Sequence, residues 1–157
     1  MKTVKDIMRT QPVSVAKNET IKKAIEQMNT SNVGFLPVLD ENQKVVGAVT
    51  DRDIALAIGK FNKTAQDIKV HEVMRSTIYS IKPEEDAASA LKIMRTKKIG
   101  RLPVVDSENK LKGVVSLMGI TRKVKEGNGL SQFAYEGSEN VVNTLHALAE
   151  RNSNENK

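Results

Sequence analysis

The sequence predicts an α+β protein made of two similar β-α-β-β-α units related by a pseudo-twofold axis. Three observations lead to this prediction: an internal repeat, an amphipathic helical stripe in each copy, and two short β-branched runs after each stripe. Residues 7–54 align with residues 73–120 without a gap, and 16 of the 48 aligned positions are identical. A unit of this size has little core of its own, so we expect the two copies to pack together.

Each copy is expected to begin with a short strand, at Ser14-Val15 and at Ser80-Ile81, followed by a helix. The helices are predicted from apolar residues at positions i, i+3, i+4 and i+7 that follow a residue able to cap a helix. The first stripe is Ile21, Ala24, Ile25 and Met28 after Thr20, and the second is Ala87, Ala90, Leu91 and Met94 after Asp86. Both stripes are expected to face the core.

A β-hairpin and a second helix complete each copy. The predicted strands are 36–39 and 45–49 in the first copy, and 102–105 and 111–115 in the second. Polar turn residues join the strands of each pair. The second helices are predicted at residues 51–58 and 117–124.

The predicted organisation is repeat 1 at residues 1–60, a connector at 61–69, repeat 2 at 70–125, and a linker with a C-terminal helix and tail at 126–157. The glycines at positions 127, 129 and 137 indicate a loop. A last helix is expected from Ser138, and its apolar side would carry Val141, Val142, Leu145 and Leu148.

The composition excludes several classes of protein. The chain has no cysteine, and its two histidines, His71 and His146, are far apart in sequence, so we expect no metal site. No apolar run is long enough to cross a membrane and the first residues lack a signal-peptide pattern, so we expect a cytoplasmic protein without membrane association. Residues 61–125 hold 14 Lys and Arg against 7 Asp and Glu, which suits a phosphate-bearing partner or a solvated basic face.

Both copies carry the same short motifs at constant spacing. Gly34-Phe35-Leu36-Pro37-Val38-Leu39-Asp40 matches Gly100-Arg101-Leu102-Pro103-Val104-Val105-Asp106, and a methionine precedes the first strand of each copy. The first copy continues after its third strand with Thr50-Asp51-Arg52-Asp53-Ile54. This duplicated pattern resembles the CBS domain, and the chain is similar to a tandem CBS pair, or Bateman module, over about residues 1–125.

The resemblance implies a regulatory module without catalytic activity or an obligatory cofactor. Its regulatory ligand would be an adenosine-containing molecule, such as AMP, ADP, ATP or S-adenosylmethionine, bound in a cleft between the repeats. Carried onto this sequence, the binding residues would be Thr50, Asp53, Thr77, Ile78, Tyr79, Ile99, Gly100, Arg101 and Pro103.

The chemistry of these residues fits that role. A carboxylate such as Asp53 can accept hydrogen bonds from both hydroxyls of a ribose, and Thr50 with the free amides of the following helix can hold a phosphate. Arg101 offers several donors to a phosphate, or it is a solvated surface residue. Asp51 and Asp53 have a second interpretation as residues that only favour a helix N-terminus.

The second copy departs from the motif, because Ser116 replaces Thr50 and Gly119 replaces Asp53. A second, weaker cleft would use Thr10, Pro12, Val13, Val33, Gly34, Phe35 and Ser116. Since it lacks the acidic residue, we expect one competent site per chain.

Two other functions stay open at this stage. The basic second half allows nucleic-acid binding, although the chain has five Phe and Tyr residues, no Trp and no nucleic-acid-binding motif. The module could also act only in dimerisation, with a separate effector protein that the sequence does not name. We expect a homodimer, because Ala55, Ile58 and Ile120 have no evident cover within one pair, and the Val141–Leu148 helix is expected to add contacts.

Overall fold

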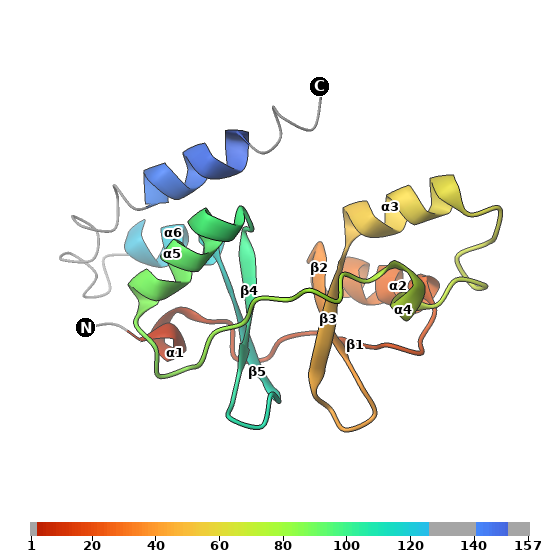
Figure 1. The fold of residues 1–157 in the computed structure, drawn as a ribbon, viewed down its shortest axis with the longest axis horizontal. Coiled ribbons are helices and arrows are strands. Elements are labelled where there is room, and N and C mark those ends of the chain that lie inside the picture. Colours follow the sequence, from red (N-terminus) through yellow and green to blue (C-terminus); the bar gives the residue numbers. More distant parts are fainter. Residues whose placement is uncertain (1–2, 126–140, 151–157) are drawn as a thin grey trace. The chain divides into compact units, whose positions relative to one another are not determined.

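The computed structural model describes residues 3–125 and 141–150, and they form two compact units, each built from separate chain segments (Figure 1). The β1–β3 unit comprises residues 12–78 and 107–111. The β4–β5 unit comprises the described residues of 3–11, 79–106, 112–125 and 141–150. Among the helices of these described ranges, none is both long and apolar enough to cross a membrane.

The β1–β3 unit has the predicted order of strand, helix, two strands and helix. Its elements are β1 (Val15–Ala16), α2 (Ile21–Ser31), β2 (Phe35–Leu39), β3 (Val45–Thr50), α3 (Asp51–Lys60) and the short α4 (Val70–Val73). β1 runs parallel to β2 with Val15 opposite Val38, and β2 runs antiparallel to β3 with Phe35 opposite Thr50. This register ends β3 at Thr50, so the strand passes directly into α3.

The β4–β5 unit repeats this plan with a shorter first strand. Its elements are α1 (Val4–Ile7), α5 (Ala87–Lys97), β4 (Arg101–Val105), β5 (Leu111–Ser116) and α6 (Leu117–Lys125), and residues 141–150 form a further helix. The strand predicted at Ser80-Ile81 is reduced to one parallel bridge between Ile81 and Val104. The helices α1 and α4 each span a single turn, and neither was predicted.

The two long helices begin and end as the repeat predicts. Thr20 Oγ1 accepts a hydrogen bond from the Lys23 amide at 3.2 Å, and Asp86 Oδ1 accepts one from the Ala88 amide at 3.0 Å. Each side chain satisfies one of the amides that a helix start leaves without a partner. The helices end at Asn32 and Lys98 in the left-handed region, with φ values of 51° and 52°.

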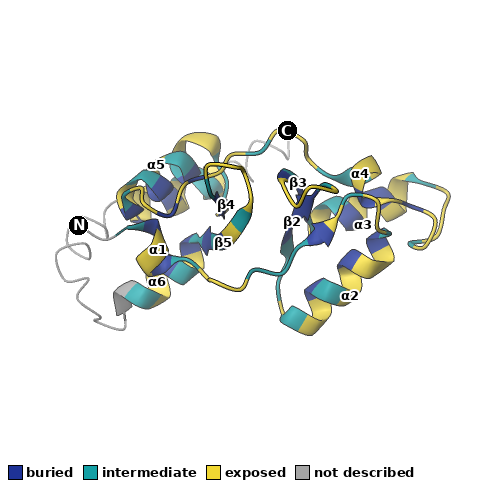
Figure 2. Ribbon diagram, turned by 90° about the horizontal axis from the view of Figure 1, so that it is seen from below, coloured by how far each residue is buried: buried dark blue, intermediate teal, exposed yellow. Residues whose placement is uncertain are grey.

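Each unit has its own apolar core, seen as the dark inner faces of the elements in Figure 2. The core of the β1–β3 unit contains Val15, Ile21, Ala24, Met28, Leu36, Val38, Val49, Ile54, Ile68 and Val70. The core of the β4–β5 unit includes Val4, Ile7, Ile81, Ala87, Ala90, Leu91, Met94, Leu102, Val104, Val115, Leu117, Ile120 and Val141.

Within the two repeats, two predicted burial assignments are wrong. Ile25 was expected in the core, but it is 38% exposed, whereas Leu91 at the equivalent position is 2% exposed. Ile120 was expected to need a partner chain, but it is fully buried within its own unit, as its equivalent Ile54 nearly is. Ile120 follows Leu117 by three residues on the inner face of α6, and both residues join the core.

The first residues of the chain pack on the second repeat. Val4 and Ile7 of α1 lie in the core of the β4–β5 unit, and the Val4 amide donates to the Glu85 carbonyl. In the same way, Val70 of α4 lies in the core of the β1–β3 unit, and its amide donates to the Glu19 carbonyl. Each unit therefore takes its short entry helix from the segment that precedes the other repeat in sequence. The repeat boundaries predicted at 60, 70 and 125 stay predictions.

The helix at residues 141–150 packs on the β4–β5 unit through a different face from the one expected. Val141 and Thr144 are buried, and Leu148 packs against the core of the β4–β5 unit. Val142 and Leu145 are exposed, although they were expected on the same side as Val141 and Leu148. The inner face follows the spacing i, i+3, i+7, and Thr144 is part of it. The predicted glycine loop and the polar end of the tail lie outside the described residues.

Candidate functional site

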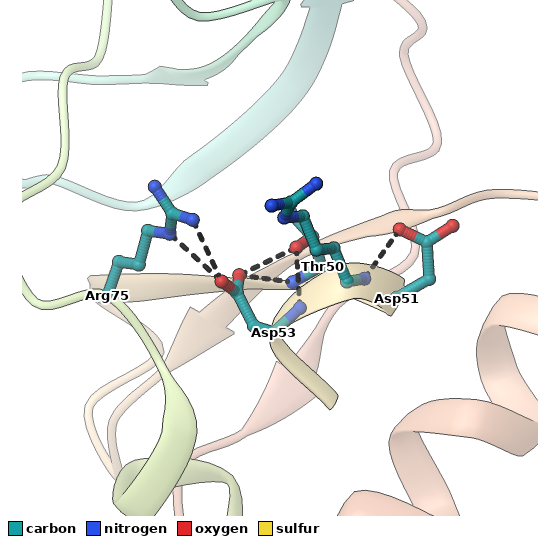
Figure 3. Close-up of polar contacts among 5 residues, drawn as sticks. Thr50, Asp51, Asp53 and Arg75 are labelled. Atoms are coloured by element: carbon teal, nitrogen blue, oxygen red, sulfur yellow. Dashed lines mark hydrogen bonds and ion pairs between the residues drawn. The ribbon is translucent and has the colours of Figure 1, made fainter. Parts of the chain in front are cut away.

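The candidate site lies at the junction of β3 and α3, where Thr50 caps the helix. The Thr50 side chain accepts a hydrogen bond from the Asp53 amide at 3.1 Å. In return, Asp53 Oδ2 accepts from the Thr50 amide at 3.0 Å and from the Thr50 hydroxyl at 2.7 Å (Figure 3). This reciprocal arrangement is a capping box, and it fixes the Asp53 side chain against the end of the strand.

The same local arrangement occurs at places where no ligand is expected. Asp6 Oδ2 accepts from the Thr3 amide and hydroxyl, and Asp67 Oδ2 accepts from the Thr64 amide and hydroxyl. The contacts of Asp53 Oδ2 are therefore explained by helix capping alone. Any role of Asp53 in binding has to depend on its other oxygen, Oδ1.

Asp53 Oδ1 is held by an arginine from a distant part of the chain. Arg75 Nε donates to Oδ1 at 3.0 Å, and Arg75 Nη2 lies 3.0 Å from the same oxygen (Figure 3). The Asp53 side chain is 9% exposed, whereas the Arg75 side chain is 54% exposed. The ion pair thus joins a nearly buried carboxylate to a guanidinium that is open to solvent.

Arg75 reaches this position because its backbone runs beside β3. The Ala48 amide donates to the Arg75 carbonyl at 3.1 Å, and the Arg75 amide donates to the Ala48 carbonyl at 2.9 Å. Gly47 makes the close approach possible, since a Cβ at this position would lie 2.9 Å from the Arg75 carbonyl oxygen. Arg75 was not predicted as a site residue. The signal was present, because Met74-Arg75 is one of the pairs that the repeat retains from Met8-Arg9.

The equivalent junction of β5 and α6 has the arginine but lacks the carboxylate. Arg9 pairs with Val114 through two backbone hydrogen bonds, beside Gly113, just as Arg75 pairs with Ala48. Ser116 Oγ accepts from the Gly119 amide at 3.0 Å, which repeats the capping contact of Thr50. Gly119 has no side chain to complete the box. Within residues 3–125 and 141–150, no acidic side chain contacts Arg9.

The nine predicted binding residues are distributed over both units. Thr50, Asp53, Thr77 and Ile78 belong to the β1–β3 unit, and Tyr79, Ile99, Gly100, Arg101 and Pro103 belong to the β4–β5 unit. The contacts described above bring Thr50 and Asp53 together, and Thr77 and Ile78 follow Arg75 in the chain. A ligand site formed by all nine residues stays a prediction.

Several of the predicted residues in the β4–β5 unit have clear structural contacts there. The Gly100 carbonyl accepts from the Leu117 amide at 3.0 Å, and the Pro103 carbonyl accepts from the Ile81 amide at 3.1 Å. Ile99 packs against the core of the β4–β5 unit, and Arg101 is exposed at the start of β4. The ring of Tyr79 lies 4.8 Å from Lys97 Nζ, within the range of a cation–π contact.

The predicted second set is divided in the same way. Thr10 and Ser116 belong to the β4–β5 unit, and Pro12, Val13, Val33, Gly34 and Phe35 belong to the β1–β3 unit. Gly34 lies against the Asp51 side chain, whose Oδ2 is 2.6 Å from the place that a Gly34 Cβ would take. A second, weaker ligand site formed by these seven residues stays a prediction as well.

A groove lies between α2 and α3 on the β1–β3 unit, with a volume of about 480 Å³. Its lining is apolar at Ile25, Met28, Ile54, Ala55 and Ile58, and polar at Asn29, Asn32 and Asp51. Ala55 and Ile58 were expected on a surface without cover, and both are exposed in the structure.

Comparison with known proteins identifies the repeat. The family model described as "CBS domain" matches residues 4–60 and again residues 70–126. The CBS domain-containing protein YhcV of Bacillus subtilis is 39% identical over 117 residues, which are 74% of this chain and 81% of that protein. Inosine-5'-monophosphate dehydrogenase of Methanocaldococcus jannaschii is 33% identical over 113 residues, but the match covers only 22% of that enzyme and 72% of this chain.

A solved structure supports the same assignment. The CBS domain pair of protein MJ0100, in complex with 5'-methylthioadenosine and S-adenosyl-L-methionine, superposes with a TM-score of 0.71 at 29% identity. The match covers 80% of this chain and 98% of that one. The family model matches both copies of the internal repeat, so both copies are CBS domains. The chain belongs to the CBS domain family and carries a tandem CBS pair, or Bateman module.

Proposed function

We propose that the chain is a regulatory module that binds one adenosine-containing ligand, such as AMP, ADP, ATP or S-adenosylmethionine, at the Thr50–Asp53 junction. The proposal assigns it no catalytic step and no obligatory cofactor. It places the protein in the cytoplasm, where it would act on a separate effector protein.

The observation that carries the proposal is the position of Asp53. Its carboxylate is nearly buried at the start of α3, where capping by Thr50 uses only Oδ2. Oδ1 faces the exposed guanidinium of Arg75, so it is the oxygen that a ribose hydroxyl can reach when that side chain moves. The ligands in the related MJ0100 structure are both adenosyl compounds, which supports this chemical class.

Ligand-dependent thermal stabilisation tests the proposal. Purified protein is melted with adenine nucleotides, guanine nucleotides, NADH and S-adenosylmethionine. At a hundredfold excess over its dissociation constant, a ligand of the folded state adds about 2.7 kcal/mol, which raises the melting temperature by roughly 5–10 °C. If no adenosyl compound shifts the curve while the protein melts cooperatively, the proposal is wrong.

A second candidate function is association between copies of the chain. The groove between α2 and α3 is lined by Ile25 and Ile58, which are 38% and 45% exposed. Exposed apolar side chains that gather on one surface are typical of an interface. We therefore propose a homodimer that uses this surface. The two functions are compatible, and they are separated by measuring ligand binding and oligomeric state on the same preparation.

A further inference from the structure

The Asp53 carboxylate has no acceptor capacity to spare in the structure. Each carboxylate oxygen offers about two lone-pair directions for hydrogen bonds. Oδ2 accepts from the amide and the hydroxyl of Thr50, and Oδ1 accepts from Nε and contacts Nη2 of Arg75. A ribose that binds Asp53 through its hydroxyls must therefore displace one of these donors.

Arg75 is the donor that can leave. The Thr50 contacts are part of the helix cap, and breaking them would expose the first turn of α3. The Arg75 side chain is 54% exposed, and its position is set by backbone bridges to Ala48 that do not depend on the guanidinium. Rotation of this side chain opens Oδ1 and leaves both β3 and the helix cap intact.

We infer that Arg75 determines which adenosyl ligands bind, by competing with the ribose for Asp53. This inference depends on the proposed function. A neutral ligand such as adenosine must break the ion pair and gives the guanidinium no new partner. A ligand with a phosphate supplies an anion, and an arginine forms charge-assisted hydrogen bonds with phosphate oxygens. The site therefore selects 5'-phosphorylated adenosine over uncharged adenosine.

The other repeat contains a matched arginine without this competition. Arg9 has the same backbone pairing beside Gly113 that Arg75 has beside Gly47. The residue equivalent to Asp53 is Gly119, so Arg9 has no carboxylate to hold at that position. Substitution of Arg9 removes the same charge and the same side chain from the chain, and it leaves Asp53 untouched.

The test measures the dissociation constants of adenosine and AMP by titration calorimetry on four proteins: wild type, Arg75→Gln, Arg75→Lys and Arg9→Gln. We expect Arg75→Gln to bind adenosine about three- to tenfold more tightly than wild type, because adenosine no longer has to break the ion pair between Arg75 and Asp53. AMP should bind with unchanged or lower affinity. The preference for AMP should thus fall by about threefold or more in Arg75→Gln, and stay at the wild-type value in Arg9→Gln. Arg75→Lys keeps the charge but loses the two-donor contact, so its preference should be intermediate.

The outcomes separate this inference from the function it depends on. If wild type binds both compounds and Arg75→Gln keeps the same preference within twofold, the inference is wrong and the proposed function stands. An equal loss of preference in Arg9→Gln also overturns it, because the effect would then be one of net charge. If wild type and Arg75→Gln bind ADP, ATP or S-adenosylmethionine but neither adenosine nor AMP, the inference is wrong and the proposed function stands. If none of these adenosyl compounds binds to either protein, the proposed function is wrong and the inference falls with it. Binding of adenosine only after Arg75→Gln supports both.

Discussion

The sulfur of Met74 lies 2.8 Å from the position that a Cβ on Gly47 would occupy. The same hypothetical atom would lie 2.9 Å from the Arg75 carbonyl oxygen, which is held by its bridge to Ala48. Gly47 thus allows the segment that carries Arg75 to lie against β3. Gly113 has the same role toward Met8 and Arg9 in the other unit, with contacts of 2.7 Å to each.

The first prediction follows from this contact. Gly47→Ala should reduce the free energy of unfolding by about 1–3 kcal/mol, because the side chain and the backbone of the neighbouring segment must both move. Urea denaturation measures the change. Gly59→Ala is the control, since apart from its chain neighbours and the backbone of its own helix no described atom lies within 4 Å of the added Cβ. Gly59 lies inside α3, so alanine there should stabilise the protein by about 0.5–1 kcal/mol. Equal effects at the two positions would contradict the packing argument.

The second prediction separates the two roles of Asp53. Asp53→Ala removes the carboxylate that completes the capping box with Thr50 and that would accept from the ribose, so we expect a stability loss of about 1–2 kcal/mol and a roughly 30- to 1000-fold loss of ligand affinity. Asp6→Ala removes the matching capping contacts with Thr3 in the other unit. It should lower stability and leave the affinity unchanged. Calorimetric titration of the binding ligand, at a temperature where both variants are folded, distinguishes the roles. Unchanged affinity in Asp53→Ala would show that Asp53 is a cap and nothing more.

Local chemistry made much of the fold predictable. Thr20 and Asp86 cap their helices because short polar side chains satisfy free amides wherever a helix begins. The hairpins follow from β-branched runs on either side of polar turns. The internal repeat supported these predictions, since each helix and strand was expected at the equivalent position of both copies. Thr50 and Asp53 were identified as a pair through the resemblance to the CBS motif, and the capping box at the strand-to-helix junction is the reason why their side chains meet.

Contacts between distant segments were not predictable in this way. Ile25 and Leu91 are equivalent in sequence, yet only Leu91 is buried, in the core that Val141 also joins. Equivalent positions in the repeat therefore need not be buried alike, because burial depends on what each unit packs against them. Arg75 was missed for a similar reason, because its contact with Asp53 depends on how closely the backbone approaches Gly47.

The third prediction concerns the helix at residues 141–150. Leu148 packs against the core of the β4–β5 unit, and its Cδ1 lies 3.9 Å from where a Gly100 Cβ would be. Leu148→Ala should therefore destabilise the protein by about 1–2 kcal/mol, less than a fully buried leucine would. Leu145 on the same helix is 45% exposed, so Leu145→Ala should change stability by at most about 0.5 kcal/mol. Chemical denaturation of both variants shows whether the helix packs through the face that carries Leu148 or through the face that carries Leu145.

The fourth prediction is a loss of stability in acid. The amide of Lys69 donates to Glu72 and lowers the pKa of that carboxyl, and the hydroxyl and amide of Thr64 lower the pKa of Asp67. A carboxyl with a lowered pKa in the folded chain contributes stability above its unfolded pKa, and the contribution is lost as the pH falls through the folded value. Stability should therefore start to fall near the ordinary carboxyl values of about 4 and continue to fall below them.

A comparison of two amide variants tests this pH dependence. Glu72→Gln removes the titrating group, so its stability should change less between pH 5 and pH 3 than that of wild type. Glu84→Gln serves as the control, because among the described residues the exposed Glu84 side chain forms no hydrogen bond or ion pair. Denaturation curves at several pH values give, for each protein, the slope of the free energy of unfolding against pH. Identical slopes for Glu72→Gln and wild type would mean that the capping contact does not persist in solution.

The last prediction is that Ile58→Glu converts a homodimer into a monomer. Ile58 is 45% exposed beside Ile25 in the groove between α2 and α3, and a carboxylate placed in an apolar interface loses hydration without gaining a partner. Closed twofold pairing is the commonest way in which identical chains cover such a surface. Sedimentation equilibrium at micromolar concentration should give a dimer for wild type and a monomer for Ile58→Glu. Lys22→Glu changes the charge at an exposed position of α2 that does not line the groove, and it should stay dimeric. A monomeric wild type would show that the groove serves another purpose than pairing of two copies.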